Sequence, residues 1–366
     1  MVDPPQFPLQ EAGTGNDYTC RIRPHQIGPE SSRQPDAPYS LYTMTLAHPE
    51  NWPVLVIKGG VDDELLRDFA ALAAAAEESD GNPPLSEQTF VTLRAGESGS
   101  HSLLALALYA PDEDSDPATA QDLAGFAVVV EEPDGTGVLE VAVHPSYRNQ
   151  GVADRLVATL KTTRGFDGLT AWSHGNHEAA ADLAAKYGYA PVRELWKMRL
   201  TTSTAELPDA GLPDQVALRA FVPGQDEEAW LAANKAAFSH HPEQGNMTRQ
   251  DLDARMAEDW FDPAGFLLAV DPAGRILGFH WTKVHPRHGS HPAIGEVYVV
   301  GVTPEAQGMG LGKALTVAGI KYLQDKGLHA VMLYTDADIA PAVSLYRGLG
   351  FTRWDADVMY GPKNGG

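Results

Sequence analysis

Three glycines at alternate positions, Gly308, Gly310 and Gly312, follow an apolar run and precede a helical pattern in the stretch "VTPEAQGMGLGKAL" (302–315). Glycine at this density lets backbone N–H groups close around a ligand, which is most often an anion. The loop therefore predicts an anion-binding site at the start of a helix, where free N–H groups and the helix dipole both favour negative charge.

Two familiar phosphate-binding motifs do not fit this loop. A P-loop requires glycine where Gln307 stands and serine or threonine where Ala314 stands. A dinucleotide-binding fingerprint that starts at the first glycine of the loop requires glycine in place of Lys313. The pattern that does fit is Gln/Arg-x-x-Gly-x-Gly/Ala at a strand-to-helix junction, and it occurs twice, at 307–312 and at 148–153.

The two copies of the loop belong to a longer internal repeat. The segment "VAVHPSYRNQGVADRL" (141–156) aligns with "VGVTPEAQGMGLGKAL" (300–315), and "LAAKYGY" (183–189) aligns with "LYRGLGF" (345–351). Each loop follows an apolar run and precedes an amphipathic helical pattern. We interpret the chain as a tandem duplication of one α/β domain.

Hydrophobic periodicity predicts the elements that position these loops. Strands are expected over 52–60, 101–110, 122–132, 137–145 and 168–173 in the first half, and over 216–221, 265–271, 275–285, 295–302 and 329–335 in the second. Helices are expected over 61–78, 151–163 and 177–187, and then over 226–238, 248–259, 312–325 and 341–349. The composition predicts a flexible N-terminal extension (1–50), a first domain (51–200), a linker (201–215) and a second domain (216–366).

The overall charge excludes some classes of partner. The 366 residues carry a formal net charge of −22, because 49 Asp and Glu outnumber 27 Lys and Arg. This balance argues against nucleic acid and anionic membranes, since both require a cationic surface. The single cysteine, Cys20, allows neither an intrachain disulfide nor a cysteine metal cluster, and no stretch is long and apolar enough to span a membrane. We expect a cytoplasmic monomer that holds its anionic ligand through backbone amides, without a metal.

The repeated loop, after a strand that ends in "GVTP" or "AVHP", resembles the GCN5-related N-acetyltransferase (GNAT) family. The resemblance implies an α/β fold of two tandem GNAT domains, each a mixed, largely antiparallel sheet flanked by helices, with the pyrophosphate of acetyl-CoA on the loop. The stretch "DADIAPAVSLYRGLGF" (336–351) resembles the family's last motif, although Ile339 replaces the usual asparagine. The implied cofactor contacts are Val300, Gly301, Val302, Gln307, Gly308, Met309, Gly310, Leu311, Gly312, Lys313, Ile339, Ala340, Pro341, Ala342, Val343 and Ser344 and, at a second possible CoA site, Val141, Ala142, Val143, Arg148, Asn149, Gln150, Gly151, Val152 and Ala153.

Acetyl transfer to an amine has three chemical requirements. The ammonium must lose a proton, the oxygen that gains negative charge must be stabilised, and the departing thiolate should be protonated. In "GEVYVVGV" (295–302) Glu296 stands in an apolar run, and strand alternation places it on one face with every second residue after it, which makes it the candidate base. A backbone N–H of this strand is expected to polarise the thioester carbonyl. By resemblance, Tyr346 is the tyrosine near the CoA sulfur and the candidate acid.

Only the second half carries both candidates. In the alignment of the repeat, Glu296 falls on Gly137 and Tyr346 falls on Ala184. We therefore expect one active site, in the C-terminal domain. The first domain is expected to bind CoA, or to support the second, without transferring acetyl groups.

Longer stretches, among them "AAFSHHPEQGNMT" (236–248) and "GFHWTKVHP" (278–286), resemble a branch of the GNAT family with two such domains in one chain. That branch acetylates the cysteinyl amine of 1D-myo-inositol 2-(L-cysteinylamino)-2-deoxy-α-D-glucopyranoside, the last step of mycothiol biosynthesis. The substrate contacts implied by this resemblance are Glu87, Glu243, Lys283, Glu296 and Tyr334. Carboxylates suit an ammonium and sugar hydroxyls, and a lysine adds a donor.

Two alternatives stay open at this point. The acceptor could be another amine, such as an aminoglycoside, a polyamine or a protein N-terminus, or the chain could be a CoA-binding module without catalysis. The histidines of "HPRHGSHP" (285–292) are interpreted as part of a mobile loop, because no carboxylate or cysteine accompanies them in a metal-binding pattern.

Overall fold

The computed structural model describes residues 52–95, 102–111, 121–202, 207–239, 242–287 and 292–363. The expected N-terminal extension, with Cys20, lies outside these ranges, as do His288 and His291. Within the described ranges, no helix has the length and apolar character needed to cross a bilayer.

In the first half an amphipathic helix, α2 (Asp63–Asp80), follows the first strand. Asp62 caps this helix, because its side chain accepts a hydrogen bond from the N–H of Leu65, and the helix buries a stripe that includes Phe69. In chain order the elements are β1 (Val54–Lys58), α2 (Asp63–Asp80), α3 (Glu87–Ala95), β2 (Ser102–Pro111), β3 (Gln121–Glu131), β4 (Gly137–Val143), η3 (Pro145–Tyr147), α4 (Val152–Thr163), β5 (Leu169–Ser173), α5 (Glu178–Lys186) and β6 (Tyr189–Thr201).

The second half repeats this order of elements. They are β7 (Ala217–Ala220), α6 (Glu227–Ala237), α7 (Pro242–Gly245), α8 (Arg249–Met256), η4 (Pro263–Gly265), β8 (Phe266–Val270), β9 (Ile276–His285), β10 (Ile294–Val302), η5 (Pro304–Ala306), α9 (Leu311–Asp325), β11 (Ala330–Asp336), α10 (Ala340–Gly348) and β12 (Thr352–Pro362). The described elements confirm the expected repeat of one α/β unit and add two short helices, α3 and α7, that periodicity did not predict.

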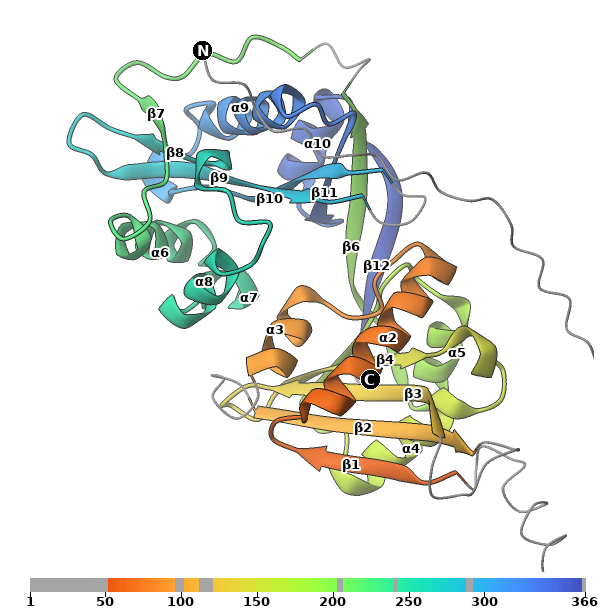
Figure 1. Ribbon diagram of the computed structural model, residues 1–366. Coiled ribbons are helices and arrows are strands. Elements are labelled where there is room, and N and C mark those ends of the chain that lie inside the picture. Colours follow the sequence, from red (N-terminus) through yellow and green to blue (C-terminus); the bar gives the residue numbers. More distant parts are fainter. Residues whose placement is uncertain are drawn as a thin grey trace, which may run out of the picture. The chain divides into compact units, whose positions relative to one another are not determined.

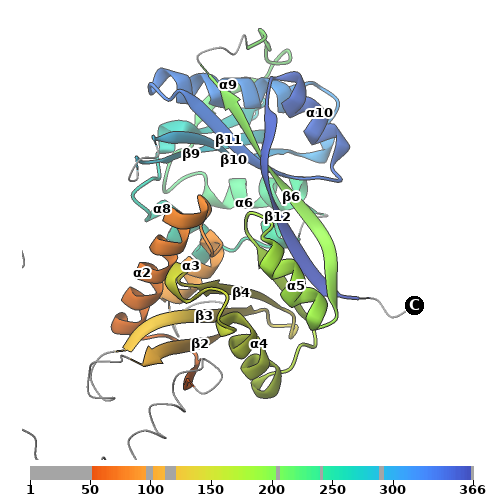
Figure 2. The same cartoon turned by 90° about the vertical axis from the view of Figure 1, so that its right-hand side faces the viewer.

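The described strands form one twelve-stranded sheet in the order β1-β2-β3-β4-β5-β12-β6-β11-β10-β9-β8-β7. The pairs β4–β5 and β10–β11 are parallel, and the other pairs are antiparallel. Helices cover both faces of the sheet: α4 packs on one face of the first half while α2 and α3 pack on the other (Figure 2). In the second half α9 packs opposite α6 and α8 (Figure 1). The prediction of mixed, largely antiparallel sheets flanked by helices is confirmed.

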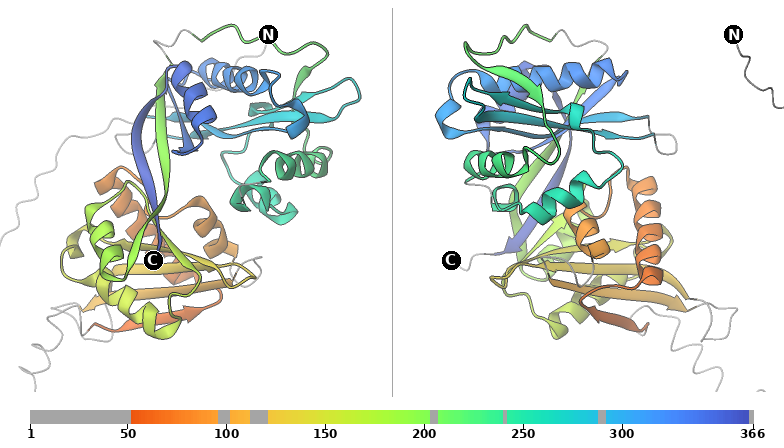
Figure 3. Two further views of the ribbon diagram at one scale, coloured as in Figure 1. Left: turned by 180° about the vertical axis from the view of Figure 1, so that it is seen from behind. Right: turned by 60° about the vertical axis from the view of Figure 1, so that its left-hand side comes forward.

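The last strand of each half lies in the sheet of the other half. β6 pairs with β11, and β12 pairs with both β5 and β6, so these two long strands run side by side between the halves (Figures 1 and 3). Neither strand was predicted, because charged side chains such as Arg193, Lys197 and Arg199 interrupt the apolar pattern of β6. The domain limits at 200 and 216 stay a prediction, since one sheet runs through both halves.

Candidate active site

The glycine loop of the second half has the geometry of an anion-binding helix start. Gly308 and Gly310 adopt φ of 80° and 78°, a region that favours glycine. The first backbone hydrogen bond of α9 runs from the N–H of Ala314 to the carbonyl of Gly310, at 3.2 Å. The N–H groups of the three residues before Ala314 therefore have no partner earlier in the helix. Gly312 is helical with room for a Cβ, which explains why Ala153 can replace it in the first copy.

The strand that leads to this loop separates from its parallel neighbour. Pairing between β10 and β11 ends at Val297 and Leu333, while pairing between β10 and β9 continues to Val302. Over Val300–Val302 the edge of β10 that faces away from β9 is thus free of a parallel ladder. This edge is where the sequence predicts contacts to the cofactor and to the thioester oxygen.

A β-bulge corrects the predicted alternation of β10. Glu296 pairs with Lys283, but Val299 pairs with Trp281, so the register shifts between Val297 and Val299. Beyond the bulge the faces exchange, because an extra residue reverses the two-residue period. Val299 therefore packs with Trp281, while Val300 packs toward α9. The prediction that every second residue after Glu296 shares its face holds for Tyr298, whose hydroxyl bonds Glu87 as Lys283 does, and is wrong for Val300 and Val302.

Because of the same bulge, the structural alignment of the two halves differs from the sequence alignment by one residue before the bulge. β3 and β4 pair without a register shift, and Gly137 starts the parallel pairing with β5 as Gly295 starts the pairing with β11. By position in the sheet, Glu296 corresponds to Val138 rather than to Gly137. The first half still has no carboxylate at the position of the candidate base.

Glu296 is buried among basic side chains. Its Oε2 lies 2.6 Å from Nε2 of His285. Lys283, on β9, is the residue directly opposite Glu296 in the antiparallel pair of β9 and β10. Burial raises the pKa of Glu296, but the hydrogen bond from His285 and the charges of His285, Lys283 and Lys197 lower the pKa overall. The carboxylate is therefore ionised at neutral pH, as a site for an ammonium requires.

A residue of the first half completes this group. Glu87, on α3, accepts hydrogen bonds from Nζ of Lys283 and from the hydroxyl of Tyr298, both at 2.8 Å. The hydroxyl of Tyr298 also accepts a hydrogen bond from Nε of Arg255 at 2.9 Å, and the ammonium of Lys283 lies 4.4 Å from the ring centre of Trp260. The structure thus brings the predicted substrate residues Glu87 and Lys283 into direct contact beside Glu296.

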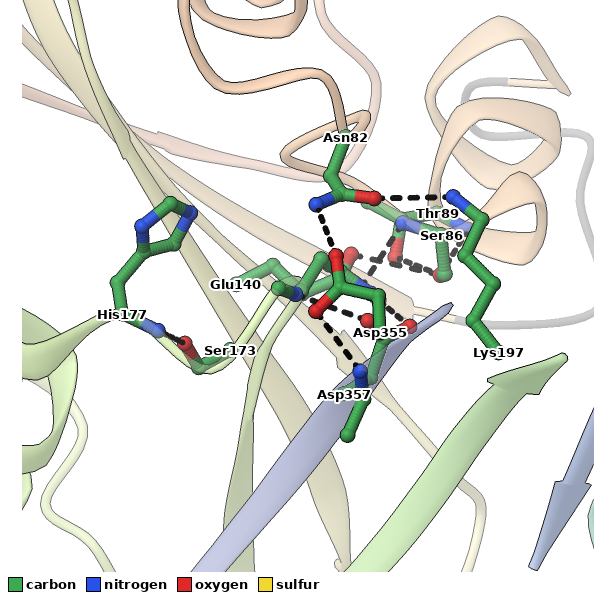
Figure 4. Close-up of polar contacts among 12 residues, drawn as sticks. Asn82, Ser86, Thr89, Glu140, Ser173, His177, Lys197, Asp355 and Asp357 are labelled. Carbon is green, nitrogen blue, oxygen red and sulfur yellow. Dashed lines mark hydrogen bonds and ion pairs between the residues drawn. The ribbon is translucent and has the colours of Figure 1, made fainter. Parts of the chain in front are cut away.

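Tyr334 joins the group from β11. It pairs with Lys197 of β6, whose ammonium lies 5.5 Å from the tyrosine ring. Burial and the nearby negative charge of Glu296 raise the pKa of Tyr334 well above its usual value. Lys197 also donates a hydrogen bond to Oδ1 of Asn82 at 2.9 Å, and the Asn82 amide in turn donates to Asp355 (Figure 4). For Glu243, the side chain lies outside the described residues, so its predicted contact stays a prediction.

The candidate acid lies on α10. The ring of Tyr346 packs edge-on against Phe351, with ring centres 5.9 Å apart, and burial raises the pKa of its hydroxyl to about 12. The phenol is therefore protonated at neutral pH. Ile339 is the N-cap of α10 and offers no side-chain hydrogen bond to the helix start, so the departure from asparagine leaves the N–H groups of the first turn without that cap.

The second predicted CoA site coincides with a cavity of about 600 Å³ in the first half. Its lining includes every predicted residue of that site except Gln150, whose side chain bonds the carbonyl of Ser146. Gly151 begins α4 with a φ of 88°, as Gly310 begins α9. Arg148 forms a bidentate salt bridge with Asp80, with N–O distances of 2.7 and 2.8 Å, so its charge is already paired.

Sequence reasoning missed a buried charge network beside this cavity. His174 bonds Glu140 at 2.8 Å and Asp357 of β12 at 3.0 Å. Burial lowers the pKa of His174, but the hydrogen bonds and charges of Asp357 and Glu140 raise it to about 10, so the ring is cationic at neutral pH. Glu140 stands in the apolar run "GVLEVAV" and was detectable there, whereas Asp357 became a partner only through the strand exchange.

Two models of known families match the chain. One, described as the acetyltransferase (GNAT) family, matches residues 230–351, and one described as an acetyltransferase (GNAT) domain matches residues 113–191. The fold and the two loops are therefore those of a tandem GNAT N-acetyltransferase, a class that uses acetyl-CoA as co-substrate.

Curated relatives show which family within this class the chain belongs to. The chain is 92% identical over 323 residues to a mycothiol acetyltransferase from Arthrobacter sp. (strain FB24), an alignment that covers 88% of this chain and 100% of the relative. A mycothiol acetyltransferase from Pseudarthrobacter chlorophenolicus is 80% identical over 323 residues, with the same coverage. The chain belongs to the mycothiol acetyltransferase family.

Solved structures share the fold at lower identity. A tandem GNAT protein from the clavulanic acid biosynthesis pathway matches with a TM-score of 0.63 and 19% identity, over 85% of this chain and 100% of that chain. A GCN5-related N-acetyltransferase from Sphaerobacter thermophilus matches with a TM-score of 0.58 and 24% identity, over 83% and 94%. These likenesses support the tandem GNAT architecture.

Proposed function

We propose that the second half transfers the acetyl group of acetyl-CoA to the cysteinyl amine of 1D-myo-inositol 2-(L-cysteinylamino)-2-deoxy-α-D-glucopyranoside, which yields mycothiol. The observation that carries the proposal is Glu296, a buried and ionised carboxylate on the strand that leads into the glycine loop. The names of the curated relatives support this choice of reaction over the other amines.

The chain's own residues fit the co-substrate. Acetyl-CoA supplies the acetyl group as a thioester. The free N–H groups at the start of α9 suit its pyrophosphate, because a helix N-terminus offers donors and partial positive charge without basic side chains. The edge of β10 at Val300–Val302 suits the pantetheine arm, which needs backbone partners.

The chemistry assigns one role to each group. Glu296 accepts a proton from the acceptor ammonium, directly or through a water, so that the amine nitrogen can bond to the acetyl carbon. A backbone N–H near Val300–Val302 stabilises the carbonyl oxygen as it gains negative charge. The C–S bond then breaks, and Tyr346 donates its proton to the sulfur and recovers one from the acylated nitrogen.

The acceptor would lie on the face formed by Glu87, Lys283, Glu296 and Tyr334, with Glu243 as a further contact. Glu87 and Lys283 offer acceptors and a donor to sugar hydroxyls, and Glu296 attracts the ammonium. In this proposal the chain acts as a cytoplasmic monomer. Its acidity argues against nucleic acid and anionic membranes as partners.

The proposal is tested by offering the full chain acetyl-CoA with the cysteinyl pseudo-disaccharide, a polyamine and an aminoglycoside in parallel. We expect mass spectrometry to find one added acetyl group on the pseudo-disaccharide, with a kcat/KM well above that for the other amines. Faster acetylation of another amine would replace the proposed acceptor. Tight CoA binding without transfer to any of the three would favour a binding module.

Replacement of Lys283 by Met should weaken acceptor binding. The change removes a charged hydrogen bond to Glu87, so we expect the KM for the acceptor to rise about tenfold while the KM for acetyl-CoA stays close to that of the wild type. Steady-state kinetics with each substrate varied in turn measures the split. Lys321→Met, an exposed lysine on α9, is the matched control, and an equal rise in both KM values would contradict the assignment.

We also propose that the cavity of the first half binds CoA without turnover. Ala184→Trp places a large side chain among the cavity-lining residues and should remove the first-half binding event in a calorimetric titration with CoA. The turnover of the second half should stay within about twofold of the wild type, since Ala184 lies in the other half of the chain. A titration unchanged by the substitution would refute this site.

A further inference from the structure

The buried base needs a way to lose the proton that it gains in each turnover. The overall reaction converts an ammonium and a thioester into an amide and a thiol, so one proton must reach solvent per acetyl group transferred. The side chain of Glu296 is 8% exposed, and a carboxyl with a lowered pKa releases its proton readily but has little direct contact with water.

His285 connects this carboxylate to solvent. Its Nε2 lies 2.6 Å from Oε2 of Glu296, and its side chain is 34% exposed. Imidazole both accepts and releases protons, whereas the other basic side chain nearby on β9, Lys283, is bonded to Glu87. His285 pairs with Ile294 and therefore lies on the same face of the sheet as Lys283 and Glu296.

We propose that His285 relays the proton of the acceptor ammonium from Glu296 to solvent, as a positioning residue that acts through the base. This inference rests on the proposed function. The proton moves from the substrate nitrogen to Glu296 and then from Oε2 to Nε2 of a neutral His285. The resulting imidazolium loses its Nδ1 proton to water, and proton exchange with solvent then moves the remaining proton from Nε2 to Nδ1, so that Nε2 can accept again in the next turnover.

The pair and the charged or polar groups around it come from four strands. Lys283 on β9 and Lys197 on β6 stabilise the ionised form of Glu296, while Tyr334 on β11 is neutral and close enough for its pKa to respond to Glu296. Glu296 itself is on β10. Lys197 and Lys283 each hold a hydrogen bond to a first-half residue, so among the described groups His285 is the partner that combines contact with the carboxylate and access to water.

The experiment compares two substitutions that separate a relay from a simple hydrogen bond. His285→Gln retains an N–H donor for Glu296 but cannot carry a proton, and His285→Ala removes both functions. We expect kcat to fall about 10- to 100-fold in both variants, with little change in either KM, and added imidazole to restore much of the kcat of His285→Ala. His329→Gln, at an exposed histidine outside the site, is the matched control.

The outcomes are decisive in both directions. A wild-type kcat for His285→Gln would overturn the relay. So would a kcat of His285→Ala that does not respond to imidazole, if that variant keeps the wild-type melting temperature. A lowered melting temperature with no response to imidazole would assign His285 a structural role instead. The comparison uses whichever amine the wild type acetylates, so failure with the pseudo-disaccharide refutes the proposed acceptor alone.

Discussion

Glu296→Gln should lower kcat about 100-fold near pH 6.5, the range expected when a general base is lost. The amide keeps the shape and can still bond His285, but it cannot accept the proton of the ammonium. Near pH 9 the loss should be smaller, because an α-amino group with a pKa of about 8 is then mostly free base. Rates measured from pH 6 to 9 for both proteins provide this comparison.

The direction of the pKa shift sharpens this test. Because the pKa of Glu296 is lowered from 4.5, its carboxylate stays ionised across the assay range, and the rise of the wild-type kcat/KM with pH reports the acceptor amine. Glu305→Gln, at an exposed carboxylate just before the glycine loop, should leave the profile unchanged. A loss in Glu296→Gln of the same size at every pH would count against its role as the base.

Tyr346→Phe should reduce kcat by about 10- to 100-fold while the affinity for acetyl-CoA stays the same, because only the proton donor to the thiolate is removed. The ring can still pack on Phe351. Since burial raises the pKa of Tyr346 to about 12, its ionisation should cause no loss of wild-type activity below about pH 11.

Two further measurements make the Tyr346 result specific. Tyr322→Phe removes a hydroxyl that bonds Asp262 outside the proposed site, and it should retain wild-type kcat. An acetyl thioester with a more acidic leaving thiol should restore part of the rate in Tyr346→Phe, because such a thiolate leaves without a proton. If Tyr346→Phe keeps the wild-type kcat, another group must protonate the sulfur.

The sequence predicted the parts of the site that depend on local chemistry. Positive φ at Gly308 and Gly310 favours glycine, and the alternating or continuous apolar runs of β2, β3, β9 and β10 are strong strand signals. The repeated loop could therefore be found twice and placed between a strand and a helix. Glu296 was visible because an acidic residue in an apolar strand needs partners.

The remaining features depend on contacts between distant parts of the chain. β6 and β12 carry charges that meet partners only after the strands exchange, as Lys197 meets Asn82 and Asp357 meets His174, so their patterns do not indicate strands. The bulge at Tyr298 is set by how β9 and β10 pair, and a strict two-residue period cannot reveal it. The bond from His285 to Glu296 joins two paired strands that periodicity treats separately.

The proposed mechanism depends most on where the thioester lies. A crystal structure of the full chain with CoA tests it directly. We predict that the pyrophosphate binds the N–H groups at the start of α9. We predict that the sulfur lies where β10 and β11 separate, within reach of the Tyr346 hydroxyl and near Glu296 of the acceptor face. A pyrophosphate bound elsewhere in the second half, or a sulfur remote from both side chains, would contradict it.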